Sequence, residues 1–147
     1  MRFICDVMLG RLARRLRLLG FDTVYARSAD ALDELRGKEG DRVLLTRRST
    51  IEANARTVRI ESEQVAEQLQ EIRGLVGPAI DKEKTFRRCT ECNAELVEVD
   101  KSEIESRVPE FIYHTHARFR VCPSCKRVYW EGSHAESMRR MLKELLP

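Results

Sequence analysis

The chain has 147 residues, of which 35% are charged and 42% are hydrophobic, and 27 basic against 24 acidic side chains leave a net charge of +3. This near-balance does not indicate a polyanionic partner, so only a local cluster of basic side chains can argue for one. No stretch approaches the roughly 18 apolar residues of a membrane span, and the first residues lack the pattern of a secretory signal peptide. We therefore expect a cytoplasmic protein with no membrane partner.

The first 76 residues alternate apolar runs with helical patterns. Runs rich in aliphatic and β-branched residues predict strands at 2–5, 23–26, 43–46 and 57–60. Leucines at helical spacing predict a helix over 8–20 that ends at Gly20. Further helices are expected after the capping residues Ser28, Ser49 and Ser62, and they end near residues 37, 56 and 74. Strands that alternate with helices predict a parallel α/β sheet flanked by helices.

The remaining residues suggest a linker and a second, smaller domain. Strands are expected at 94–99, 111–121 and 128–130, and a capping box over 102–105 predicts a short helix. Another capping box over 133–136 begins a last amphipathic helix, whose apolar side is expected to pack on one of the two domains. The expected division is therefore residues 1–76, a linker over 77–85, and residues 86–147.

Two matched cysteine pairs organise the second domain: Cys89 with Cys92, and Cys122 with Cys125. Each Cys-x-x-Cys turn places two thiolates on one side of a tight loop, at the distance of about 2.3 Å that zinc–sulfur bonds need. Disulfides, or cysteines that only pack, are the alternatives, but nothing in the sequence favours an extracellular setting. The spacing predicts a structural zinc site, and the remaining Cys5 fits a small core residue.

Carboxylates follow the predicted strands at the edge where parallel sheets collect ligands. Asp6 comes directly after the first strand, where a buried carboxylate is costly unless it is used or paired. Asp30 and Asp33 lie on the helix after the second strand, and they either face the same crevice or are simply solvated. In the first case Asp6, Asp30 and Asp33 would be catalytic residues that hold Mg²⁺ or Mn²⁺ for phosphodiester hydrolysis.

Arginines approach the same edge of the predicted sheet. Arg11, Arg14 and Arg15 lie within about one turn of the first helix, and Arg47 and Arg48 follow the third strand. Together they predict a rim that binds the phosphates of RNA. The alternative for the first three is an exposed helical face with good helix propensity.

Several stretches of the chain resemble the Mut-seven C-terminal ribonuclease family. They are Asp6-Val7-Met8-Leu9-Gly10-Arg11-Leu12-Ala13-Arg14, Leu16-Arg17, Leu19-Gly20-Phe21-Asp22, Leu44-Leu45-Thr46-Arg47 and Tyr129-Trp130-Glu131-Gly132-Ser133-His134. The resemblance covers nearly the whole chain. It implies a PIN-like nuclease fold, with its parallel sheet flanked by helices, joined to a four-cysteine zinc ribbon, and metal-dependent cleavage of RNA as the family's proposed activity. It also implies that Asp6 is the first metal-binding carboxylate and that an acidic residue within 30–34 is another.

The chain departs from the family pattern at position 48. The family usually has Thr-Arg-Asp after the third strand, whereas this chain has Thr46-Arg47-Arg48, so a cation replaces a metal-ligating carboxylate. We therefore expect an RNA-processing protein with weak or absent hydrolysis, because Arg48 beside Asp6 would repel a divalent cation. The alternatives are an inactive RNA- or ribonucleoprotein-binding module and a protein-interaction adaptor that uses the ribbon and the last helix.

Overall fold

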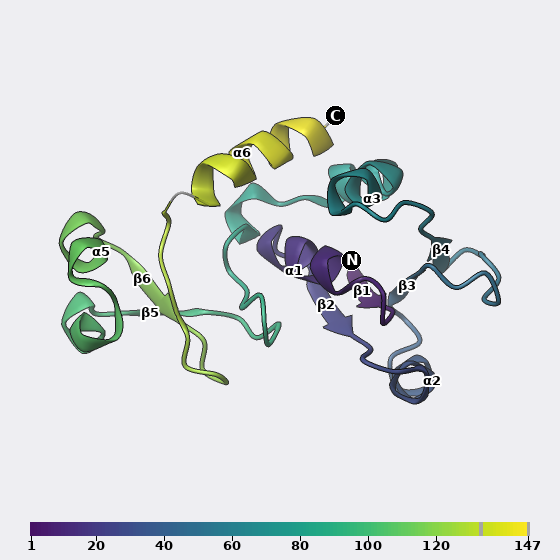
Figure 1. Cartoon of the computed structure of the whole chain (residues 1–147), viewed down its shortest axis with the longest axis horizontal. Helices are drawn as coiled ribbons and strands as arrows, with labels where there is room; N and C mark the ends of the chain where they lie inside the picture. The colour runs from purple at the N-terminus through teal and green to yellow at the C-terminus, as the bar shows by residue number, and fades with distance from the viewer. Residues whose placement is uncertain (133, 147) are drawn as a thin grey trace.

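The first half of the chain forms a parallel sheet with helices packed against both faces (Figure 1). The computed structural model describes residues 1–132 and 134–146. The strand order is β2-β1-β3-β4, and Ile4 of the first strand lies between Val24 and Leu44. The strands are β1 (Arg2–Cys5), β2 (Asp22–Tyr25), β3 (Val43–Thr46) and β4 (Thr57–Arg59), and the helices are α1 (Gly10–Leu18), α2 (Ala29–Lys38), α3 (Val65–Glu71) and α4 (Arg73–Val76). This architecture confirms the predicted α/β class.

Side chains of β1 alternate between two apolar cores. Phe3 and Cys5 belong to the larger core together with the leucines of α1, whereas Ile4 belongs to the smaller core with Leu32 of α2. The alternation follows from the two-residue period of a strand, and burial on both faces explains why the strand is apolar throughout. The leucine stripe predicted for the first helix is at most 1% exposed at Leu9, Leu12, Leu16 and Leu19.

The second half carries a small antiparallel sheet with the order β5-β6-β7. Its strands are β5 (Val97–Val99), β6 (Phe119–Val121) and β7 (Val128–Tyr129), and α5 (Glu110–Thr115) lies between β5 and β6 along the chain. Phe119 is 2% exposed and its ring centroid lies 6.4 Å from that of Trp130. Few large side chains are buried here, so the cysteine cluster must supply much of what holds this sheet together.

The last helix, α6 (His134–Leu145), returns to the first half of the chain (Figure 1). Met138 and Leu145 are buried in the same core as the leucines of α1, and Arg73 donates a hydrogen bond to the carbonyl of Leu146 at 3.2 Å. Its apolar side therefore packs on the α/β core. Among the described residues, no helix is long and apolar enough to cross a membrane. The capping box predicted at 133–136 includes Ser133, which lies outside the described residues.

Residues 77–85 form two short 3₁₀ turns, η1 (Gly77–Ala79) and η2 (Lys82–Lys84). Val76 just before them is fully buried, and Ile80 packs against the α/β core. Gly20, with φ of 95°, passes so close to η2 that an added Cβ would lie 2.5 Å from the carbonyl oxygen of Lys84. The segment is therefore packed closely against the end of α1.

The helix predicted after Ser49 is wrong, because this segment is an irregular loop. The guanidinium of Arg59 donates to the carbonyls of Ser49 (3.1 Å) and Ile51 (2.7 Å). Asn54 accepts the backbone N–H of Arg56 at 2.9 Å and so closes a turn into β4. These side-chain contacts satisfy backbone groups that a helix would otherwise pair, so the capping sequence alone does not decide the conformation.

Three other local predictions also need correction. The strand predicted over 111–121 is a strand only at its end, because a helix begins after Pro109, a residue that is tolerated at a helix start. The capping box near residue 102 is formed by Asp100 and Glu103 instead. Ser62 does not cap the helix that follows it, since its N–H and that of Glu61 donate to the carboxylate of Glu71.

Candidate functional site

The four cysteine sulfurs of the two Cys-x-x-Cys turns lie within 4.8 Å of one another. Cys89 Sγ and Cys125 Sγ, which belong to different turns, are 3.7 Å apart. A tetrahedral ion with bonds of about 2.3 Å separates its ligands by about 3.8 Å, so these sulfurs have the spacing that zinc requires. Across residues 1–132 and 134–146, no other group of three or more His, Cys, Asp or Glu side chains is arranged to hold a metal ion. The cysteines are thus positioned as the predicted structural zinc requires.

The two cysteine turns share one backbone geometry. In each, the N–H of the second cysteine donates to the sulfur of the first, at 3.3 and 3.4 Å. Asn93 (φ 65°) and Lys126 (φ 67°) then close the turns, and the N–H of each donates to the carbonyl of the first cysteine. The N–H of Arg127 hydrogen-bonds to Cys125 and lowers the pKa of its thiol to about 6, which favours the thiolate that binds metal.

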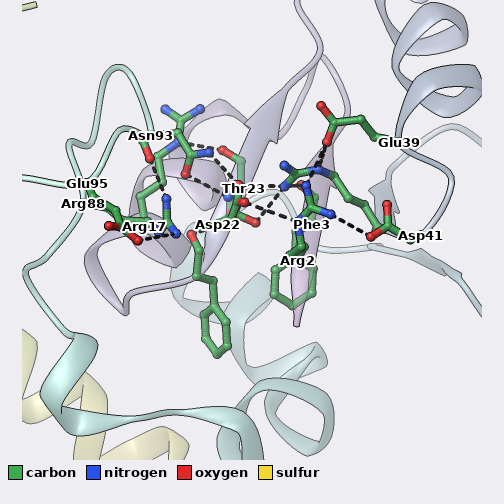
Figure 2. Close-up of polar contacts among 12 residues, drawn as sticks. Arg2, Phe3, Arg17, Asp22, Thr23, Glu39, Asp41, Arg88, Asn93 and Glu95 are labelled. Atoms are coloured by element: carbon green, nitrogen blue, oxygen red, sulfur yellow. Dashed lines mark hydrogen bonds and ion pairs between the residues drawn. The ribbon is translucent and has the colours of Figure 1, made fainter. Parts of the chain in front are cut away.

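Asn93 fastens the first cysteine turn to the edge of the parallel sheet (Figure 2). Its Oδ1 accepts the backbone N–H of Thr23 at 2.9 Å, and its Nδ2 donates to Asp22 Oδ1 at 2.7 Å. Arg17 makes a second connection, since its Nε donates to the carbonyl of Thr23 (2.9 Å) and its Nη1 to that of Thr90 (2.6 Å). The hydrogen bonds of Asn93 and Arg17 therefore hold the first cysteine turn against α1 and β2.

Asp22 is the charged centre of this connection. Arg42, whose side chain is only 4% exposed, donates from Nη1 to Asp22 Oδ1 at 2.8 Å. Burial raises the pKa of Asp22, but the hydrogen bonds from Arg42 and Asn93 outweigh it and lower the pKa to about 2. Asp22 therefore stays ionised at ordinary pH, where it pairs with a cation and an amide at once.

The side chain of Asp6 is enclosed by donors from this chain. Asp6 follows β1 and is 1% exposed. Its Oδ2 accepts from Thr46 Oγ1 at 2.7 Å, while its Oδ1 accepts from the N–H of Val7 (2.7 Å) and from Arg48 Nη2 (2.6 Å). The contact arises because β1 and β3 are neighbours, so the residues after each strand meet at one edge. Both carboxylate oxygens therefore already have hydrogen-bond partners.

The Asp6–Arg48 contact is an ion pair. Burial raises the pKa of Asp6, but the hydrogen bonds from Arg48, Thr46 and Val7 outweigh burial and lower the pKa below its ordinary value. The same contact raises the pKa of Arg48. A guanidinium therefore neutralises the Asp6 carboxylate at the place where a divalent cation would bind.

The other two candidate carboxylates do not form a group of metal ligands with Asp6, although the charge of Asp33 helps to raise the pKa of Arg48. Asp30 and Asp33 are exposed on α2, and Ser28 rather than an acidic residue caps that helix by accepting the N–H of Ala31 at 3.1 Å. Within the described part of the chain, neither belongs to a group of three metal-binding side chains. Mg²⁺ and Mn²⁺ favour several oxygen ligands, so the residues present around Asp6 do not fit a site for either ion.

The five candidate arginines fall into separate groups. Arg11 and Arg14 line a groove beside the first cysteine turn, where Arg14 Nε lies 3.3 Å from Glu91 Oε1. Arg15 instead lines a hollow between α3 and α6. Arg47 donates to the carbonyl of Glu61 at 3.2 Å on the β4 side, and Arg48 binds Asp6. The structure therefore does not assemble all five into one rim.

Two residues of the site were missed from the sequence although each leaves a signal there. Arg17 is 7% exposed, and its position four residues after the buried Ala13 puts it on the inner side of α1. Asn93 directly follows a Cys-x-x-Cys turn, where the backbone needs a positive φ that asparagine tolerates well. A charged residue on an apolar stripe and an asparagine after a turn both indicate a specific contact.

No curated protein and no solved structure matches the chain. The model of the Mut7-C RNAse domain matches residues 1–142. This range spans the parallel sheet, the four cysteines and most of α6. The chain therefore belongs to the Mut7-C RNAse domain family.

Proposed function

We propose that this chain is an RNA-binding, RNA-processing protein of PIN-like fold whose own phosphodiester hydrolysis is weak or absent. The observation that carries the proposal is the ion pair between Arg48 Nη2 and Asp6 Oδ1 at 2.6 Å. A hydrolytic centre that uses divalent ions concentrates negative charge, whereas here a guanidinium cancels it. The proposed ligand is RNA, free or within a ribonucleoprotein, and membership of an RNAse domain family supports RNA as the ligand.

In this proposal the cysteine cluster is a structural zinc site. Zinc bound by four thiolates has no open position for water or substrate, so it supplies stability and no catalytic group. None of the five cysteines forms a disulfide, and a protein that depends on thiolates suits a reducing compartment such as the cytoplasm. Zinc would hold the two cysteine turns together and thereby keep the second half of the chain against α1 and β2.

The test compares three forms of the full chain on one labelled structured RNA, with and without Mn²⁺. The wild type is expected to bind the RNA and to cleave it slowly or not at all. Arg48→Asp removes the internal cation and adds a carboxylate beside Asp6, so it is expected to acquire Mn²⁺-dependent cleavage. Adding Asp6→Asn to that variant is expected to abolish the new cleavage.

The matched control is Arg47→Asp, which makes the same change of charge one residue away. Arg47 faces the carbonyl of Glu61 rather than Asp6, so this variant is expected to gain no cleavage. Brisk Mn²⁺-dependent cleavage by the wild type that disappears in Asp6→Asn would refute the proposed inactivity. Absence of RNA binding by the wild type would refute the proposed ligand and favour a protein-interaction adaptor.

A further inference from the structure

We infer that single-stranded RNA lies in the groove between α1 and the first cysteine turn, so that the zinc-binding half forms one wall of the binding site. The inference rests on the proposed RNA binding and specifies where the strand runs. The groove has a volume of about 590 Å³, within the range of roughly 300–1,000 Å³ that ligand sites occupy. Its walls are α1, the end of β2, and residues 91–93 of the first cysteine turn.

The groove is strongly basic. Arg11, Arg14, Arg17 and Arg27 line it, and Glu91 is the one carboxylate among the described residues that do so. Arg11 and Arg27 are exposed, so they can turn toward a phosphate without losing a buried partner. Whereas the whole chain has a net charge of only +3, these five side chains alone sum to +3 (4 − 1). This groove therefore concentrates positive charge, which the overall composition does not reveal.

Arg17 gives the groove a fixed cation. Its side chain is 7% exposed, and the carbonyls of Thr23 and Thr90 accept from its Nε and Nη1. Within residues 1–132 and 134–146, no hydrogen-bond partner occupies its Nη2, although Arg17 lines the groove. A guanidinium that is held in place by two carbonyls and keeps one nitrogen available is preorganised for a phosphate oxygen.

One end of the groove adjoins the Asp6 centre. Tyr25 lines the groove next to Gly10, and its hydroxyl donates to the carbonyl of Val7, the residue that follows Asp6. The other end reaches Cys92 and Asn93. A strand in the groove therefore runs from the edge of the parallel sheet to the zinc-binding turn. The lining includes the aromatic side chain of Tyr25, and aromatic rings are the groups on which RNA bases stack.

The structure provides a matched control on the same helix. Arg15 lies in α1 but lines the hollow beside α3 and α6 and is not among the residues that line this groove. Arg36 is exposed on α2 and is absent from the groove lining. A double change of Arg15 and Arg36 to alanine alters the net charge as much as a double change of Arg11 and Arg27. Comparing the two double variants therefore distinguishes RNA binding along this groove from a general electrostatic attraction to basic side chains.

The experiment measures the affinity of the zinc-loaded full chain for a fluorescently labelled single-stranded oligouridylate at several salt concentrations. Each phosphate contact contributes about 0.7 to the log–log salt slope of a single strand, which is about fivefold in affinity at about 0.1 M salt. Arg11→Ala with Arg27→Ala is therefore expected to weaken binding about 25-fold and to flatten the slope by about 1.4. Arg15→Ala with Arg36→Ala is expected to change affinity less than about threefold.

Glu91→Gln supplies a test that loss of folding cannot imitate. The change removes the carboxylate that pairs with Arg14 and keeps the size of the side chain. Because a repulsive charge leaves the groove and Arg14 is released, binding is expected to tighten about fivefold. An affinity that is unchanged or weaker would overturn the inference.

The outcomes also separate the groove from the proposed function. Normal RNA binding by the wild type with equal losses in the two double variants, or no loss in either, would overturn the groove and leave RNA binding intact. Binding of the structured RNA but not of the oligouridylate by the wild type would overturn the groove alone, and binding of neither RNA would overturn both. A selective loss in the groove variant together with a gain in Glu91→Gln would establish the track.

Discussion

The four cysteines and the Asp6 centre were the two candidate metal sites in the sequence, yet the structure builds them in opposite ways. The cysteine sulfurs lie within 4.8 Å of one another at a spacing that zinc fits. The Asp6 carboxylate has Thr46, Val7 and Arg48 as partners instead, and Asp30 and Asp33 stay exposed on α2. One site gathers negative charge for a cation, whereas the other already contains its cation in the form of Arg48.

The difference shows how much of a metal site is encoded locally. A Cys-x-x-Cys turn contains half of its site within four residues, so only one tertiary contact, between two turns, must form. A carboxylate centre at the edge of a parallel sheet draws on several separate segments. A single replacement in one segment can therefore cancel it, as Arg48 does here.

The largest expected effect is that of zinc removal. Freshly prepared protein is expected to contain one zinc per chain by elemental analysis. Structural zinc is worth about 10–16 kcal/mol of apparent binding energy in small modules, so Cys122→Ser is expected to abolish the ordered second half. Circular dichroism and thermal unfolding measure the loss, and Cys5→Ala is the control for the loss of a thiol. Zinc-free protein that melts like the wild type would contradict this prediction.

The second effect concerns the ion pair that closes the Asp6 centre. Arg48→Met removes the charged partner of a carboxylate that is 1% exposed, so it is expected to raise the pKa of Asp6 and to lower the melting temperature by about 5–10 °C. Adding Asp6→Asn is expected to restore most of the loss, because the buried charge is then gone. Equal stability of all three proteins would show that the pair contributes nothing.

A smaller effect is expected from Asn93, which connects the cysteine turn to the sheet. Asn93→Gly keeps the positive φ but removes the hydrogen bonds to Thr23 and Asp22, at a cost of about 2–3 kcal/mol. The equivalent change at the other turn, Lys126→Gly, is the control, since among the described residues Lys126 donates only to the nearby carbonyl of Pro123 in addition to the turn itself. Chemical denaturation of both variants measures the difference, and equal losses would argue against the connection.

The smallest effect is a pH dependence that originates at Asp22. Its pKa of about 2 lies below the ordinary 3.8, so the folded state binds the proton less well than the unfolded state does. This contribution is complete above about pH 4 and is lost as the pH falls toward about 2, and it amounts to about 1–2 kcal/mol after allowance for partial exposure. Asp22→Asn is expected to remove it, so the stability difference between wild type and variant should shrink over that range. A difference that is constant with pH would contradict the assignment.

Local patterns in the sequence were sufficient for the strands and the first helix of the α/β half. Three patterns can each be recognised within a short segment: the apolar runs at β1 and β3 and the leucine stripe of α1. All three are confirmed. Capping boxes were less reliable. The one at Ser49 predicted a helix that is absent because Arg59, ten residues away, binds the carbonyls in question.

The sequence by itself determined the parallel α/β class and the paired cysteine turns, because these depend on spacing within short segments. Only the tertiary structure decided which side chains meet across segments. It brought Arg48 onto Asp6 because β1 and β3 are neighbours, and it placed Arg11 in the groove beside the first cysteine turn but Arg15 in the hollow lined by α3 and α6. It also joined Asn93 to Asp22, 71 residues apart in the chain. Contacts of this kind depend on how the elements pack, and no local period encodes that.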